Sequence, residues 1–334
     1  WAVAATAVPE VDPASRAEPA APTRAAPCVA PVLEDPIGVL AHLRERDPDA
    51  ELFVVGLDGP ASGYLALASL DRYDGDAWSF DRTFVPTGGR IPLDASAVPP
   101  GPDTATLTVE VGEGPAPAGI PYLERPLEVV GVEVDHDPAT GMLRPAQVPQ
   151  PGDRFRIASA TSREGVDDLV GEALLGSPVA ADTTLPPDLE AHLDRVVARL
   201  EARTGEVAAP TTAFLAAVAT ELRTTGRRVE AGPATGDDDD AVRPTGGTSY
   251  AAVTAAVLSK RQGQPEQFAT LLALVARHLG VPARVVTGFR LRPLDSSGPA
   301  PPEAVVTPEQ AWTWVEVPVE GAGWVVLDPT PLET

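Results

Sequence analysis

The hydrophobic and polar positions along the chain change their period partway. Between about residues 51 and 160, short apolar runs rich in β-branched and aromatic residues are separated by Gly, Pro and Asp turn signals, which is typical of strands. From about residue 184 onward, apolar residues recur every three or four positions, which indicates amphipathic helices. Residues 36–46 also predict a short helix. This order predicts an α+β protein, with an antiparallel β-rich part followed by helices packed on a further antiparallel sheet.

In the second half, the predicted helices are 186–203, 210–223, about 249–259 and 265–279, and the predicted strands are 281–289, 311–317 and 324–331. The helix at 265–279 is apolar on nearly all sides, which predicts that it is buried. Gly280 suits its C-terminal stop, because glycine adopts the left-handed conformation without a steric penalty.

The chain divides into three predicted parts. Residues 1–35 are rich in Ala and Pro and bury too little apolar surface to order themselves, so we expect an extended tether. Residues 36–165 form the β-rich module, and residues 184–334 form the core. The core contains an acidic loop near 231–247, where Asp237–Asp240 favour a solvated surface excursion over a metal site because adjacent like charges repel.

Composition excludes several classes of function. The 334 residues carry 25 Lys+Arg and 48 Asp+Glu, a net charge of −23, which argues against a nucleic-acid partner. The single cysteine, Cys28, excludes an internal disulfide framework and a cysteine-based zinc site, and the four histidines are scattered. We expect no metal ion and no cofactor. Asp74 and Asp76 raise the question of calcium, but a solvated turn explains them better, because further oxygen ligands are missing.

No run of about 18 apolar residues occurs, so no segment of this chain is expected to span a membrane. The apolar start at Trp1 fits two interpretations. It is either the frayed end of a membrane helix from a longer protein or part of an ordinary linker.

The last third contains a series of specific phrases. They are Gly263-Gln-Pro-Glu-Gln-Phe-Ala269, Ala276-Arg-His-Leu-Gly-Val-Pro-Ala-Arg-Val-Val-Thr-Gly-Phe289, Trp314-Val-Glu-Val317, Gly321-Ala-Gly-Trp324 and Asp328-Pro-Thr-Pro331. Over residues 247–331 this order resembles the transglutaminase-like core, a papain-like fold. The β-rich module resembles, more weakly, the extracytoplasmic domain of membrane-anchored actinobacterial members. The resemblance implies a location on the extracytoplasmic face of the cell membrane, anchored through segments outside this chain.

The resemblance also implies where a catalytic triad would stand. In that family a Cys begins the buried helix, a His on a neighbouring strand takes its proton, and an Asp orients the His. Here these positions hold Pro265, Trp312 and Asp328. Proline has no nucleophile and an indole is no general base. A register shifted by two residues would put Gln310 at the His position, and glutamine is not a base either.

Other groups do not replace the missing ones. Ser259 and Thr270 are the nearest hydroxyls, but neither has an adjacent base in the motif, and His278 lies on the arm of the helix that leads away. Trp312 is expected to fill the cleft, and Asp328 to bond backbone N–H groups of its own turn. Arg284 is interpreted as a structural strand residue, with a buried ion pair as the alternative.

We therefore predict a non-catalytic domain that binds or scaffolds an unknown protein or cell-envelope partner. The alternative is an active acyl transferase or peptidase with a displaced nucleophile. A third hypothesis, carbohydrate binding by the β-rich module, requires exposed aromatic side chains, and its candidates are Tyr64, Tyr73, Trp78 and Tyr122.

Overall fold

The computed structural model describes residues 35–80, 83–92, 98–115, 117, 119–162, 187–229, 247–291 and 303–332. Apart from Asp35, the predicted tether lies outside the described residues. Cys28 and Asp237–Asp240 also lie outside them. Within the described ranges, no helix has the length and apolarity that crossing a bilayer requires.

The helices are α1 (Pro36–Arg46), α2 (Pro187–Thr204), α3 (Thr212–Thr225), α4 (Tyr250–Val253) and α5 (Pro265–His278), with a π-helix at Thr254–Lys260 and a 3-10 helix at Pro308–Gln310. The first half contributes β1 (Phe53–Asp58), β2 (Tyr64–Leu70), β3 (Arg72–Tyr73), β4 (Trp78–Ser79), β5 (Val85–Pro86), β6 (Asp103–Val111), β7 (Arg125–Val130), β8 (Val134–His136), β9 (Leu143–Pro145) and β10 (Arg154–Thr161). The second half contributes β11 (Arg227–Arg228), β12 (Gln262–Gly263), β13 (Arg284–Arg290), β14 (Glu303–Val306), β15 (Ala311–Val319) and β16 (Gly323–Leu327).

The predicted helices are confirmed to within about two residues at their ends, the usual uncertainty of helix boundaries. The predicted helix at 249–259 begins as α4 and continues as the π-helix. Strand β14 and the short parallel pair β11–β12 were not predicted from the sequence.

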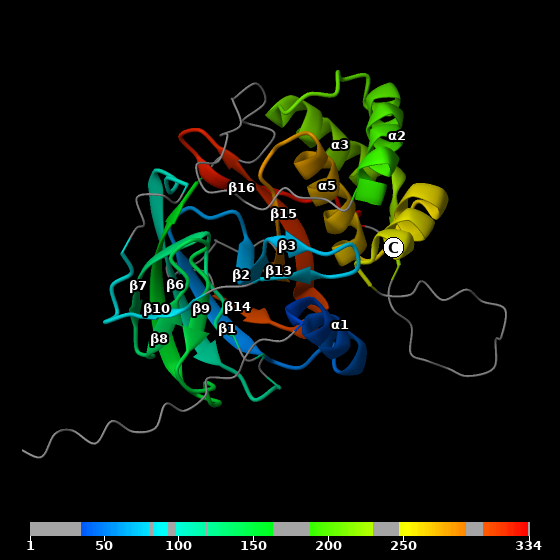
Figure 1. Cartoon of the computed structure of the whole chain (residues 1–334). Coiled ribbons are helices and arrows are strands. Elements are labelled where there is room, and N and C mark those ends of the chain that lie inside the picture. Colours follow the sequence, from blue (N-terminus) through cyan, green and yellow to red (C-terminus); the bar gives the residue numbers. More distant parts are fainter. Residues whose placement is uncertain are drawn as a thin grey trace, which may run out of the picture.

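Two larger antiparallel sheets organise the molecule. One has the strand order β14-β1-β6-β10-β7, and the other has the order β16-β15-β13-β2. Helices α2, α3 and α5 gather on one side of β13 and β15, and the five-stranded sheet lies on the other (Figure 1). The α+β class with helices packed on an antiparallel sheet is therefore confirmed.

Each of the two predicted segments contributes one strand to a sheet that is otherwise formed by the other segment. Strand β2, from the predicted β-rich module, pairs with β13 of the core, and β14 of the core pairs with β1 of the module. The hydrogen bonds of both sheets therefore cross the predicted boundary between 36–165 and 184–334.

Helix α5 is the centre of the helical layer. Every residue from Pro265 to Arg277 is buried, as the apolar pattern predicts. Gly280 ends the helix with a φ of 79°, a conformation that favours glycine. The helix packs against β15.

Gly288, in the phrase Val286-Thr-Gly-Phe289, occupies a position of β13 where a side chain would not fit. A Cβ atom on this residue would lie 2.0 Å from the backbone oxygen of Leu65, so only glycine lets β2 approach β13 here. The pairing register of the two strands shifts between Thr287 and Gly288. The Tyr64 ring at the start of β2 reaches past β13 to the Trp314 ring of β15, and the two ring centres are 5.0 Å apart.

Arg284 forms a buried ion pair with Glu316 across β13 and β15. The Arg284 Nε and Nη2 atoms lie 2.8 and 2.6 Å from Glu316 Oε2, and both side chains are 4% exposed. Trp314 Nε1 donates to Glu316 Oε1 at 3.1 Å, and the Arg284 guanidinium stacks 4.1 Å from the centre of the Trp324 ring. Of the two interpretations of Arg284, the structure shows the ion pair.

We predict that Arg284→Met lowers the free energy of unfolding by about 3–5 kcal/mol, because it leaves the Glu316 carboxylate buried without its partner. The matched control is Arg154→Met, which removes an exposed ion pair with Glu110 (side chains 72% and 39% exposed) and is expected to cost at most about 1 kcal/mol. Urea unfolding of the three proteins measures both effects. Equal losses in the two variants would contradict a structural role for the buried pair.

Candidate functional site

The carboxylate of Asp328 collects hydrogen bonds from three parts of the chain. Its Oδ2 atom accepts from Trp312 Nε1 at 2.9 Å and from the Tyr64 hydroxyl at 2.8 Å. Its Oδ1 atom accepts from the backbone N–H of Thr330 at 3.0 Å, the bond expected within its own turn. The sequence anticipated that turn, but not the two side-chain donors.

Trp312 is 5% exposed and lies near the start of β15. The guanidinium carbons of Arg228 and Arg290 lie 5.2 and 5.6 Å from the centre of its ring, within the range of cation–π contact. The indole therefore has arginine packed against its ring and a carboxylate on its N–H.

Pro265 occupies the first position of α5, where its missing N–H would have no helical partner in any case. Arg44 of α1 connects this turn to β15. Its Nη1 donates to the Ala311 carbonyl at 3.3 Å, and its Nη2 lies 3.9 Å from Glu266 Oε2. Ala311 and Glu266 adjoin Trp312 and Pro265 in the chain, so one guanidinium spans both. We call the region of Tyr64, Trp312 and Asp328 the Asp328 corner.

Tyr64 contributes to the Asp328 corner from β2. Burial, and next the neighbouring Asp328 carboxylate, raise the pKa of its phenol far above the ordinary value, so the hydroxyl stays a proton donor. The sequence suggested Tyr64 only as an aromatic for carbohydrate binding. The other three aromatics considered for that role, Tyr73, Trp78 and Tyr122, are buried, and so they present no exposed ring to a sugar.

The two hydroxyls considered as displaced nucleophiles both form hydrogen bonds. Thr270 is fully buried; its hydroxyl donates to the Glu266 carbonyl at 2.7 Å and accepts from Trp78 Nε1 at 3.0 Å. Ser259 is exposed and donates to the Thr254 carbonyl at 3.0 Å. Neither hydroxyl has a base as its partner.

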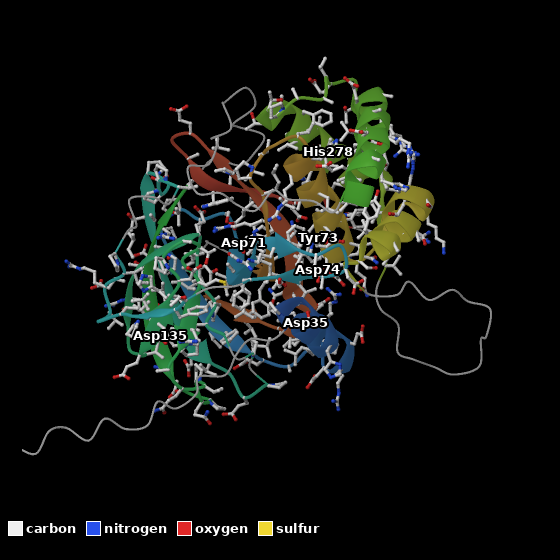
Figure 2. All side chains as sticks on the ribbon, viewed as in Figure 1. Asp35, Asp71, Tyr73, Asp74, Asp135 and His278 are labelled. Atoms are coloured by element: carbon white, nitrogen blue, oxygen red, sulfur yellow. The ribbon has the colours of Figure 1, made fainter. Side chains whose placement is uncertain are left out.

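His278 lies at the C-terminal end of α5, away from the first turn (Figure 2). Its Nε2 atom is 2.9 Å from Asp194 Oδ1 on α2. The sequence predicted this place, at the opposite end of the helix from Pro265, but not the pairing with Asp194.

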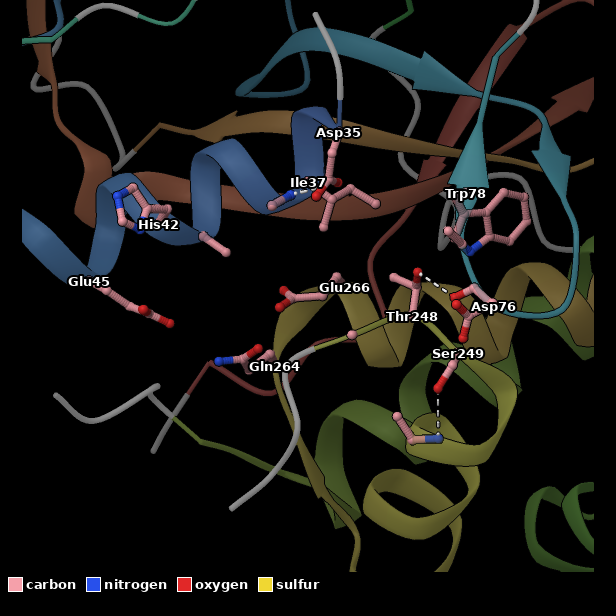
Figure 3. Close-up of a pocket in the computed structure, with 15 residues that line it drawn as sticks. Asp35, Ile37, His42, Glu45, Asp76, Trp78, Thr248, Ser249, Gln264 and Glu266 are labelled. Carbon is pink, nitrogen blue, oxygen red and sulfur yellow. Dashed lines mark hydrogen bonds between the residues drawn. The ribbon is translucent and has the colours of Figure 1, made fainter. Parts of the chain in front are cut away.

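A pocket of about 500 Å³ opens beside the first turn of α5, between that turn, α1 and the β3–β4 hairpin (Figure 3). Its lining includes Gln264 and Glu266, on either side of Pro265, but neither Trp312 nor Asp328. His42 and Glu45 project from α1 on the facing wall (Figure 3). The pocket is thus separate from the Asp328 corner.

The hydroxyls of Thr248 and Ser249 in this pocket form hydrogen bonds with backbone groups. Thr248 Oγ1 donates to the Asp76 carbonyl at 3.3 Å, and Ser249 Oγ accepts the Ala252 N–H at 3.2 Å as the cap of α4. Among the described residues that line the pocket, no hydrogen bond joins His42 to a hydroxyl. The described lining residues therefore include an imidazole but no nucleophile that is hydrogen-bonded to it.

The acidic turn of the β3–β4 hairpin is closed by its own backbone. Asp74 Oδ1 accepts the N–H groups of Ala77 and Asp76, each at 2.8 Å, and these bonds lower the pKa of the Asp74 carboxyl. Within the described ranges, no group of three His, Cys, Asp or Glu side chains could hold a metal ion. Of the two interpretations of Asp74 and Asp76, a calcium site or a turn, the geometry favours the turn.

Glu266 is a buried carboxyl, 4% exposed, in the first turn of α5. Desolvation raises its pKa, and Arg44 opposes that shift only partly at 3.9 Å. The Glu266 carboxyl therefore tends to stay protonated at pH values above the ordinary pKa of a carboxyl.

Comparison with known proteins identifies the core. Residues 202–329 match the transglutaminase-like superfamily, so this part of the chain carries a transglutaminase-like core domain. No curated protein matches the chain in sequence.

Two solved structures share the fold, both of the periplasmic domain of TgpA from Pseudomonas aeruginosa. The first has a TM-score of 0.57 and 20% identity, and the match covers 87% of this chain and 91% of that one. The second, bound to ethylmercury, has a TM-score of 0.54 and 18% identity, with 87% and 93% covered. Because the likeness covers 87% of the chain, it shows the fold of more of the chain than residues 202–329.

We predict that Glu266→Gln removes a pH dependence of stability. Because the folded pKa is raised, the native state holds a proton that the unfolded chain releases, so this group lowers stability as pH rises above about 4.5. The variant is expected to gain stability relative to the parent from pH 5 to 7, by at most about 1.4 kcal/mol per pH unit. Urea unfolding across that pH range measures the difference.

The matched control is Glu45→Gln, which removes an exposed carboxyl from the facing wall of the same pocket. Stability curves for Glu266→Gln and the parent that run parallel with pH would show that the buried carboxyl is ionised in the native state, against the prediction.

Proposed function

We propose that this chain is a non-catalytic, transglutaminase-like domain that binds or scaffolds a partner outside the cytoplasm. One observation carries the proposal. The Asp328 carboxylate, retained at the orienting position of the triad, accepts a hydrogen bond from an indole at the position of the proton acceptor. An indole N–H donates but cannot take a proton at neutral pH. An indole in this place could not do the chemistry of the His in an Asp–His pair.

The surroundings of the Asp328 corner support the same conclusion. Cysteine chemistry needs a thiol at the helix N-terminus and a base that accepts its proton. Pro265 supplies no thiol, and Tyr64 is held protonated. Trp312 is buried between Asp328 and two arginines, so the position of the base is filled by packed side chains.

The extracytoplasmic location rests on likeness. The structures with the same fold are of a periplasmic domain, and the N-terminal segment from Trp1 through the Ala/Pro-rich stretch has the composition of a tether. We propose that the domain is attached to a membrane through segments outside this chain. Its partner is a protein or another component of the cell envelope.

An assay for turnover tests the proposal directly. In γ-glutamyl transfer to a primary amine and in peptide hydrolysis, the chain and its Cys28→Ser variant are both expected to stay at the uncatalysed rate, because no group at the Asp328 corner can attack a carbonyl. Turnover that survives in Cys28→Ser would establish a displaced nucleophile and overturn the proposal. His42→Ala then reports whether the pocket beside α5 is responsible.

Restoring the missing groups tests the correspondence of positions. In a Cys28→Ser background, Pro265→Cys combined with Trp312→His is expected to create a thiol whose pKa lies about one unit or more below that of Pro265→Cys alone, because an imidazole stabilises the thiolate. The pH profile of iodoacetamide alkylation measures both thiols. Identical profiles would mean that residues 265 and 312 do not face each other.

A further inference from the structure

The pocket beside the first turn of α5 is lined by acidic side chains, and we call it the α5 pocket. Its volume of about 500 Å³ lies in the range of cavities that hold small ligands. Among the described residues that line it, none is Lys or Arg and four carry carboxyl groups: Asp35, Glu45, Asp76 and Glu266. The net charge of −23 adds to the attraction of such a pocket for cations.

Glu266 is the buried member of this set, and its carboxyl group lacks a close partner. Among the described residues, only its own backbone N–H donates a hydrogen bond to it. Arg44 Nη2, at 3.9 Å, lies beyond hydrogen-bond distance, and Nη1 of the same guanidinium donates to the Ala311 carbonyl. A buried carboxylate without close donors is costly, so a cation that enters the α5 pocket would stabilise the charged form of Glu266.

The positive groups near Glu266 are fewer than the negative ones. The N-terminus of α5 contributes about half a positive charge, and Arg44 contributes one guanidinium. His42 lines the pocket and is positive only when it is protonated. Besides Glu266, three exposed carboxyl groups face these charges, namely Asp35, Glu45 and Asp76. The balance in the α5 pocket is therefore negative and favours a cationic ligand.

The chemistry of the walls narrows the class of cation. Within the described ranges, no group of three His, Cys, Asp or Glu side chains could hold a metal ion, so the pocket is suited to an organic cation. Ile37 and Ala41 are half-buried in its lining and Ala77 is exposed there, so they offer apolar contact to a hydrocarbon stem. A guanidinium loses less hydration than an ammonium on entering such a site, and its planar fork matches a carboxylate through two N–H···O bonds.

We propose that the α5 pocket binds the guanidinium of an arginine side chain carried by a basic peptide segment, with Glu266 as the carboxylate partner. The methylene stem of the arginine packs on the apolar wall, as long cationic side chains commonly do. Further basic groups of the segment face Glu45 of α1 and Asp76 of the β3–β4 hairpin, which border the pocket (Figure 3). This inference rests on the proposed function, because it specifies the chemistry of the bound partner.

Binding of a cation to Glu266 is expected to release a proton. The pKa of the Glu266 carboxyl is raised by burial in the free chain, where Arg44 opposes the shift and Glu45 and Asp35 add to it. A guanidinium lowers that pKa, so the affinity is expected to rise between about pH 5 and 7, by at most about tenfold per pH unit. Deprotonation of His42 would act in the same direction. The proton release is therefore expected to persist in His42→Ala and to disappear in Glu266→Gln.

The experiment titrates acetylated pentapeptide amides into the folded chain. Each peptide has lysine at both ends and glycine beside each lysine, with arginine, lysine or neutral citrulline in the centre. Calorimetry in two buffers measures affinity and proton release, and ¹⁵N spectra follow the amide signals of Ala41 and Ala77. We expect the arginine peptide to bind most tightly, the lysine peptide next, and the citrulline peptide about tenfold or more weakly than the arginine peptide.

Variants test the partner of the guanidinium. Glu266→Gln is expected to weaken binding of the arginine peptide about tenfold or more. Glu45→Gln, which removes an exposed carboxylate, is expected to weaken it about fivefold or less. The matched control is Glu128→Gln, which makes the same charge change at an exposed position of β7 and is expected to bind like the parent. Circular dichroism shows whether each variant folds, and the comparison of arginine with citrulline needs no variant.

Several outcomes would overturn the inference. They are absence of binding, equal affinity for the arginine and citrulline peptides, a lysine peptide that binds as tightly as the arginine peptide, and a folded Glu266→Gln variant with the affinity of the parent. A chain without turnover that binds no arginine peptide refutes only the ligand. A chain that turns over substrate refutes the proposed function, whichever peptide the α5 pocket binds.

Discussion

The arrangement of the site depends on the hydrogen bonds that the buried carboxylate of Asp328 accepts. A carboxylate removed from water must be compensated by donors, and here they come from Tyr64 on β2, Trp312 on β15 and the backbone of Thr330. The same residue gives its carbonyl to Arg223 of α3. One residue after β16 thus connects both edges of the four-stranded sheet to the helical layer.

This connection requires residues from outside the matched core of 202–329. Strand β2 supplies Tyr64, and it can approach β13 only because Gly288 lacks a side chain. Helix α1 supplies Arg44, which bonds β15 and lies near Glu266 at the start of α5. The upstream segment therefore completes the site itself, in addition to preceding the core in the chain.

Among the described residues, the side chains that hydrogen-bond the Asp328 carboxylate are those of Tyr64 and Trp312, and both donate. An indole N–H and a phenol with a raised pKa donate to its carboxylate, and Arg290 Nε lies 3.9 Å from the same oxygen. Such a set can hold an anion but cannot take a proton from a nucleophile.

The sequence by itself determined the α+β class, the buried α5 with its stop at Gly280, and the residue types at 265, 312 and 328, because these depend on local periodicity and on motifs within short stretches. Only the tertiary structure decided which side chains meet at Asp328. Tyr64, Arg223 and Arg290 lie on three elements far apart in the chain, and nothing local marks them as partners. The pairings of β2 with β13 and of β14 with β1 likewise join strands far apart in the chain, and hydrophobic patterns do not specify such partners.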